Sequence, residues 1–106
     1  MNKFQLTLDN LTSKATILDK IGQQLGYTDG QRWGKNWSAL NDILRYLEDG
    51  GIYGKNEIIA LPVTFEVSNW KAFKEAAPDD FQILVDIFES TRNFYEGRVE
   101  FEFIKN

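Results

Sequence analysis

The chain has 106 residues, of which 42% are hydrophobic and 14% aromatic, and this length supports one hydrophobic core rather than two. It contains neither cysteine nor histidine, which excludes disulfides and thiolate chemistry and removes the commonest general base and metal ligand. We therefore expect a single domain over residues 1–106 with no catalytic residues, no metal and no cofactor.

The net charge of −4 comes from 12 basic and 16 acidic residues. This balance favours a basic partner surface over nucleic acid. The sequence has no run of about 18 apolar residues that could span a bilayer, and no basic start followed by an apolar stretch of the signal-peptide kind. We expect a cytoplasmic protein that binds neither a membrane nor nucleic acid directly.

The first elements are a strand and a helix. Apolar and polar side chains alternate over residues 3–9, which predicts a strand with one buried face. A helix is predicted from about Lys14, with Thr12 or Ser13 as its N-cap and Gly26 as its stop. Its apolar stripe indicates a contribution to the core.

A second helix is predicted after Asn36, whose side chain can accept hydrogen bonds from the free amides of the first turn. Its buried stripe consists of Leu40, Ile43, Leu44 and Leu47. Its outward face consists of Ser38, Asn41, Asp42 and Arg45. Three glycines within residues 50–54 then interrupt the helix, so that residues 48–57 are predicted to form a mobile loop.

The second half of the chain repeats the pattern. A strand is predicted after Pro62, ending near residue 67, and a short helix follows with Ser68 or Asn69 as its cap. A longer helix starts at Pro78 and stops at Gly97, because proline suits the first helical turn and glycine suits the turn after the last one.

Alternation over residues 99–103 predicts a third strand. Helical crossovers between strands imply a parallel sheet. Alternating strands imply helices on one face and solvent on the other. The predicted fold class is therefore α/β: a two-layer fold with a three-stranded parallel sheet in the order 1-2-3 and helices packed mainly on one face.

Two tryptophans, Trp33 and Trp37, flank the start of the second helix. Rigid rings with a polar edge give a large contact area at low entropic cost and are common at interfaces. The alternative is that both rings pack beneath the following loop. The sequence leaves both interpretations open.

Asp42 is the acid on the outward face of the second helix, where a guanidinium of a partner could reach it. The alternative is an ordinary surface residue paired with Arg45, three positions further on. Glu48 and Asp49 extend the acidic surface into the loop, although Lys55 offsets them locally.

The sequence fits other kinds of functional site poorly. Residues 50–56, GGIYGKN, lack the glycine spacing and the Ser or Thr of a phosphate-binding loop, and they precede a strand. Adjacent Asp79 and Asp80 fit the electrostatics of a helix start. A small hydrolase that uses carboxylates is a further alternative, although no pair of residues stands out for it.

Residues 33–44 read WGKNWSALNDIL, and this segment resembles the core motif of the barstar family, which consists of small intracellular ribonuclease inhibitors. The match covers the aromatic, Gly, Asn, large apolar, Ala, Leu and second Asp positions. The predicted order of elements over the whole chain also fits that family. The resemblance implies a barstar-like fold and a protein that catalyses nothing.

The resemblance further implies inhibition by occlusion. The second helix and its preceding loop would enter the active-site cleft of a basic ribonuclease or nuclease toxin, as a monomer in a one-to-one complex. Asp42 would meet arginines and a histidine of the nuclease, and Trp33 would lie beside the cleft. Opposite net charges would speed the encounter.

Several positions depart from the family pattern. Ser38 replaces the first helix aspartate, Asn41 replaces an aromatic residue, and the basic Arg32 precedes the motif. Ser90, with Glu89 adjacent, stands about where the family has another contacting acid. We therefore expect a nuclease different from that of the family prototype, or another toxin.

The atypical loop over residues 48–57 offers replacement contacts. The complete set of expected contact residues is Arg32, Trp33, Lys35, Trp37, Ser38, Asn41, Asp42, Arg45, Glu48, Asp49, Tyr53 and Glu89. The alternative function is a regulatory or scaffold domain of the same fold that binds another protein without inhibiting an enzyme.

Overall fold

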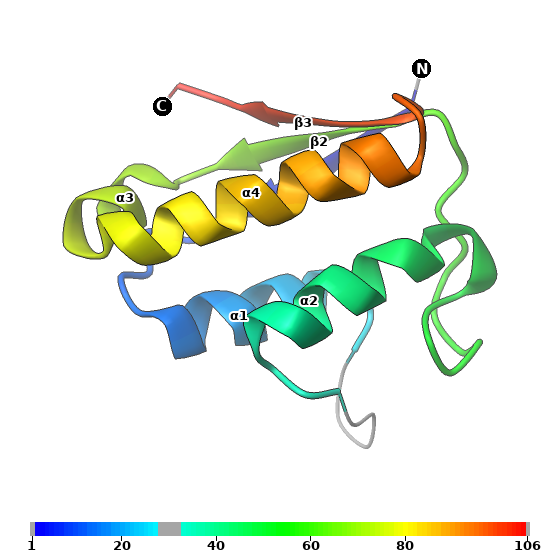
Figure 1. Cartoon of the computed structure of the whole chain (residues 1–106), viewed down its shortest axis with the longest axis horizontal. Helices are drawn as coiled ribbons and strands as arrows, with labels where there is room; N and C mark the ends of the chain where they lie inside the picture. The colour runs from blue at the N-terminus through cyan, green and yellow to red at the C-terminus, as the bar shows by residue number, and fades with distance from the viewer. Residues whose placement is uncertain (1, 28–32, 106) are drawn as a thin grey trace.

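Strands and helices alternate along the chain in the computed structural model, which describes residues 2–27 and 33–105 (Figure 1). The elements, in order, are β1 (Asn2–Thr7), α1 (Lys14–Gln24), α2 (Trp37–Ile43), the 3₁₀ segment η1 (Leu44–Asp49), β2 (Val63–Ser68), α3 (Lys71–Ala76), α4 (Pro78–Phe94) and β3 (Val99–Phe103).

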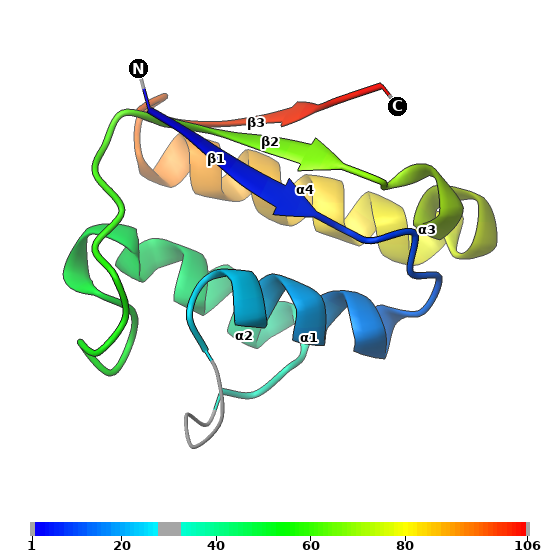
Figure 2. The same cartoon turned by 180° about the vertical axis from the view of Figure 1, so that it is seen from behind.

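The sheet places β2 between β1 and β3, and both pairings are parallel. This order and direction confirm the predicted topology. Helices α1, α2 and α4 lie on one side of the sheet, as Figures 1 and 2 show from opposite directions. α1 packs against β1, α4 packs against β3, and α2 packs against α1 and α4. The outward residues Ser38 and Asp42 of α2 are exposed.

Aromatic rings fill the space between the sheet and α4. Phe65 of the central strand lies between Phe4 and Phe101, with ring centroids 5.1 Å and 5.0 Å away. Phe88 of α4 stacks on Phe101 at 4.0 Å. These contacts hold α4 over the sheet, because each ring buries a large apolar area.

The opposite face of the sheet is polar, as the alternation predicted. Lys3 Nζ lies 3.4 Å from Glu66 Oε2, and the Gln5 amide donates a hydrogen bond to Glu66. The hydrogen bond from Gln5, with the nearby charge of Lys3, lowers the pKa of the Glu66 carboxyl. None of the helices in the described residues is both long and apolar enough to cross a membrane.

The predicted cap of α3 is wrong. Ser68 is the last residue of β2 and pairs with Thr7 of β1. Asn69 adopts a left-handed backbone, with φ of +54°, and its amide donates to Thr7 Oγ1 over 3.1 Å. Ser68 therefore belongs to the sheet, the Asn69 side chain bonds to the end of β1, and α3 begins after Trp70 without a side-chain cap.

The loop after η1 has its own hydrogen bonds. Asn56 N donates to Gly50 O over 2.7 Å, and Asn56 Nδ2 donates to Leu25 O over 3.2 Å. The Tyr27 hydroxyl accepts from Ile52 N over 2.9 Å. These bonds tie the segment that the sequence predicted as mobile to the end of α1.

Gly51 is required by that loop. Its φ is +80°, and a Cβ there would lie 2.5 Å from Asn56 Nδ2 and 2.8 Å from the Tyr27 hydroxyl. A side chain would therefore strain the backbone and displace both anchoring groups.

Candidate partner-binding face

The start of α2 is held by its predicted cap. Asn36 has an extended backbone, with φ of −136°, and its Oδ1 accepts a hydrogen bond from Ala39 N over 2.7 Å. Leu40 and Ile43 are buried and anchor the inner side of the helix. The first turn is thereby fixed before any partner binds.

The end of α2 is held by a buried tyrosine. At Tyr46 the backbone leaves helical geometry, with φ of −114° and ψ of 27°. The Tyr95 hydroxyl from beyond α4 donates to Leu44 O over 2.8 Å and accepts from Leu47 N over 3.3 Å. Burial raises the pKa of this hydroxyl, so it stays protonated and can donate near neutral pH.

The outward face of α2 carries the polar residues that the sequence placed there. Ser38 and Asp42 of α2 are exposed, Asn41 of α2 is half-buried, and Arg45 is exposed on η1, which continues from the end of α2. Among the residues that the structure describes, Asp42 makes no ion pair. The proposed pairing with Arg45 is wrong, because the Arg45 guanidinium lies over the Phe94 ring, 5.0 Å from its centroid.

A shallow open groove between α2 and α4 adjoins this face. It is lined by Trp37, Ser38, Asn41, Ile83, Asp86, Ile87 and Ser90. Asp86 and Ser90, both from α4, were not among the predicted contact residues. Their spacing of four positions places them on one side of a helix, but only the packing of α4 against α2 shows that this side meets the candidate face. The Asp86 carboxylate accepts a hydrogen bond from Gln82 over 3.0 Å.

The two tryptophans have different environments. Trp33 is 8% exposed and packs on α1, where a Cβ at Gly22 would lie 2.6 Å from its ring. The expected position of Trp33 beside a partner's cleft is therefore wrong, since the ring belongs to the core. Trp37 is half-buried at the edge of the groove, with Lys14 Nζ 5.8 Å from its ring centroid.

The remaining predicted contact residues differ in their partners and in their exposure. Lys35 pairs with Asp19 of α1 over 3.1 Å, and Glu48 lies 3.7 Å from the Arg98 guanidinium. Asp49 is exposed, and Tyr53 is 44% exposed. Arg32 lies outside the described residues.

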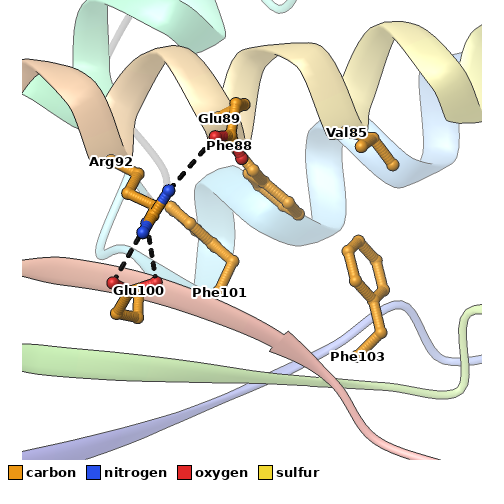
Figure 3. Close-up of a pocket in the computed structure, with 7 residues that line it drawn as sticks. All are labelled: Val85, Phe88, Glu89, Arg92, Glu100, Phe101 and Phe103. Atoms are coloured by element: carbon orange, nitrogen blue, oxygen red, sulfur yellow. Dashed lines mark hydrogen bonds and ion pairs between the residues drawn. The ribbon is translucent and has the colours of Figure 1, made fainter. Parts of the chain in front are cut away.

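Glu89 is not brought together with α2. Its carboxylate lies 3.3 Å from the Arg92 guanidinium, in a cavity between α4 and β3 (Figure 3). Successive helical residues point in different directions, so its neighbour Ser90 faces α2 instead. Within the described residues, no three acidic, cysteine or histidine side chains gather as a metal site would require.

The sequence of the chain matches a known family. Residues 1–104 match the family described as Barstar (barnase inhibitor). The chain belongs to the barstar family. Membership supports a barnase-inhibitor-like protein at the level of the family. The members of this family are protein inhibitors rather than enzymes, and they bind ribonucleases. Comparison with curated proteins gives no match.

Proposed function

We propose that this protein is a stoichiometric inhibitor of a ribonuclease or a related nuclease toxin, and that the outer face of α2 occludes the active site of that nuclease. The observation that carries the proposal is the Asp42 carboxylate, which is exposed on a helix fixed at both ends and makes no ion pair among the described residues. Membership of the barstar family supplies the class of partner.

Asp42 suits recognition of a cationic active site. Nucleases hold RNA phosphates with basic side chains, and a carboxylate on a rigid helix can occupy the position of a phosphate. A charge pair of this kind, buried at an interface, typically costs about 2–5 kcal/mol of affinity when one partner is removed. Because α2 is already ordered by Asn36 and Tyr95, little conformational entropy is lost on binding.

The neutral side chains beside Asp42 define a different specificity from that of the family prototype. Ser38 and Asn41 offer hydrogen bonds where the family pattern has an acid and an aromatic residue, and Asp86 provides a second carboxylate at the groove. We propose a basic nuclease whose cleft has fewer cationic groups opposite the first turn of α2. Undiminished affinity for the prototype ribonuclease would contradict this.

The loop provides a second region of contact. Asp49 and Tyr53 are exposed beyond the end of η1, whereas Glu48 is partly neutralised by Arg98. We expect Asp49 and Tyr53 to contribute less than Asp42, because contacts at the rim of an interface are solvated.

The test is capture of a nuclease from native lysate on the immobilised protein, in parallel with Asp42→Ala. The matched control is Glu75→Ala, which removes the same charge from an exposed position on α3. We expect wild type and Glu75→Ala to retain a basic nuclease in a one-to-one complex and to inhibit it. Asp42→Ala should lose most of the binding while keeping its fold.

Equal capture of a protein without nuclease activity by all three variants would overturn the proposal. That result would favour a scaffold domain of the barstar fold. If Asp42→Ala captured the nuclease as well as wild type does, the partner would still be a nuclease, but the outer face of α2 would not be the binding face.

A further inference from the structure

The three-stranded sheet has two outer edges. Leu8 N donates to Ser68 O and Ile104 N donates to Val67 O, which shows that even-numbered residues of β1 and β3 direct their backbone groups toward β2. Odd-numbered residues therefore direct their N–H and C=O groups outward. Such edges can pair with strands of other molecules unless something blocks them.

A side chain of α1 covers the end of the β1 edge. Thr7 N donates to Gln24 Oε1 over 2.8 Å, and Gln24 Nε2 donates to Thr7 O over 2.8 Å. The amide thus satisfies both outward backbone groups of Thr7 in the reciprocal manner of a neighbouring strand. A second strand cannot bond to Thr7 while Gln24 is in place.

An ion pair covers the β3 edge. The Phe101 ring stacks on α4, so the adjacent Glu100 starts from the opposite face of the sheet. Arg92 of α4 nevertheless lies with its Nε 3.0 Å from both Glu100 carboxylate oxygens. Because β2 occupies the inner side of β3, the pair must pass around the outer edge of β3, and Figure 3 shows it beside that strand.

Glu89 supports the same arrangement from α4. Its carboxylate holds the Arg92 guanidinium at 3.3 Å, while Glu100 holds it from the strand. The hydrogen bond and charge of Glu100, followed by the charge of Glu89, raise the pKa of Arg92. Glu89 therefore has a role at the sheet edge, away from the face of α2.

We propose that Gln24 and the Arg92–Glu100 pair are edge guards, which prevent the outer strands from pairing with the same strands of a second copy of this chain. At β3 an antiparallel partner strand would need the outward backbone groups of Val99 and Phe101, and the ion pair lies across them. A partner strand that paired along the whole of β1 would need those of Thr7. The guards are separate from α2, so this inference does not depend on the proposed function.

The test at β3 compares Glu100→Thr with Glu102→Thr. Both replacements remove one negative charge from the same face of the same strand and introduce a residue that favours strands, but Glu102 makes no ion pair within the described residues. Self-association is measured by sedimentation equilibrium over a range of concentrations, and amide hydrogen exchange identifies the strand involved.

We expect Glu100→Thr to associate at least about tenfold more strongly than Glu102→Thr, since two additional backbone hydrogen bonds would give about that factor. Amide exchange over residues 99–103 should slow in the associated form. Equal association of the two variants would overturn the proposal at β3, as would association without protection of these amides.

The test at β1 compares Gln24→Ala with Gln23→Ala. Gln23 is exposed and bonds through its side chain to Asp19 on the same helix. Gln24→Ala should associate and protect the amides of residues 3–7, while Gln23→Ala stays monomeric. Near-ultraviolet circular dichroism confirms that the tryptophans remain packed, and Gln24→Glu, which keeps the acceptor but loses the donor, should associate as well. If both Gln24→Ala and Gln24→Glu stayed monomeric, the proposal at β1 would be overturned.

Discussion

The motif at residues 33–44 divides into an inner and an outer region, although it is continuous in the sequence. Trp33 packs on Gly22 inside the core, whereas Asp42 stands exposed without an ion pair among the described residues. The inner region, with Asn36 and Leu40, fixes the helix, and the outer region is available to a partner. The motif thus combines a structural base with a small exposed surface, which we propose as the recognition surface.

The strongest test of this division is Trp33→Ala. We expect it to lower the free energy of unfolding by about 3–5 kcal/mol, because a large buried ring is replaced by a cavity. Urea denaturation, followed by circular dichroism, measures the change. A cost below about 1 kcal/mol would place Trp33 in the outer region after all.

Tyr95→Phe examines how the far end of α2 is held. Removing the hydroxyl leaves Leu44 O and Leu47 N without the partner that it provides, and we expect a loss of about 1–3 kcal/mol of stability. Tyr53→Phe is the control, since its hydroxyl makes no hydrogen bond within the described residues. Equal stability of the two variants would show that Tyr95 does not anchor the segment.

Asn36→Ala examines the near end of the same helix. Loss of the cap should lower stability by about 1 kcal/mol, and it should also weaken partner binding because the first turn of α2 becomes less ordered. The readouts are thermal unfolding and the affinity of the captured nuclease. Asn93→Ala, at an exposed position of α4, should change neither.

Asp42→Asn is expected to have the smallest effect on stability, within about 0.5 kcal/mol of wild type, because no interaction with a described residue is lost. Its effect on partner binding should be large by comparison. Chemical denaturation measured alongside nuclease affinity separates the two quantities. A stability loss that matched the binding loss would contradict the assignment of Asp42 to the outer region.

Local patterns were sufficient for most of the fold. Alternation predicted the strands and their buried faces. Short-range chemistry predicted the cap at Asn36 and offered Thr12 or Ser13 as the cap of α1, of which Ser13 is the cap in the structure. The start of α4 at Pro78 was also predicted, because proline acts within one helical turn. The cap of α3 was not, since Asn69 bonds across to Thr7, a residue 62 positions away.

The candidate site shows the same limit. Helical spacing correctly predicted that Ser38, Asp42 and Arg45 point outward, since that depends only on the local helical geometry of α2 and η1. It could not predict that Arg45 stacks on Phe94, because this contact requires α4 to pack against η1.

The sequence by itself therefore determined the strands and the α-helices, although not η1, together with the order of the sheet, the outward face of α2 and the family to which its motif points. The elements and the outward face follow from periodicity and from interactions within a few residues, the sheet order follows from the handedness of helical crossovers, and the family follows from the resemblance of the motif. The tertiary structure decided that Trp33 is internal, that Glu89 faces β3 and that Tyr95 holds the end of α2. Each of these depends on which elements become neighbours, and one-dimensional periodicity indicates a buried face without identifying what buries it.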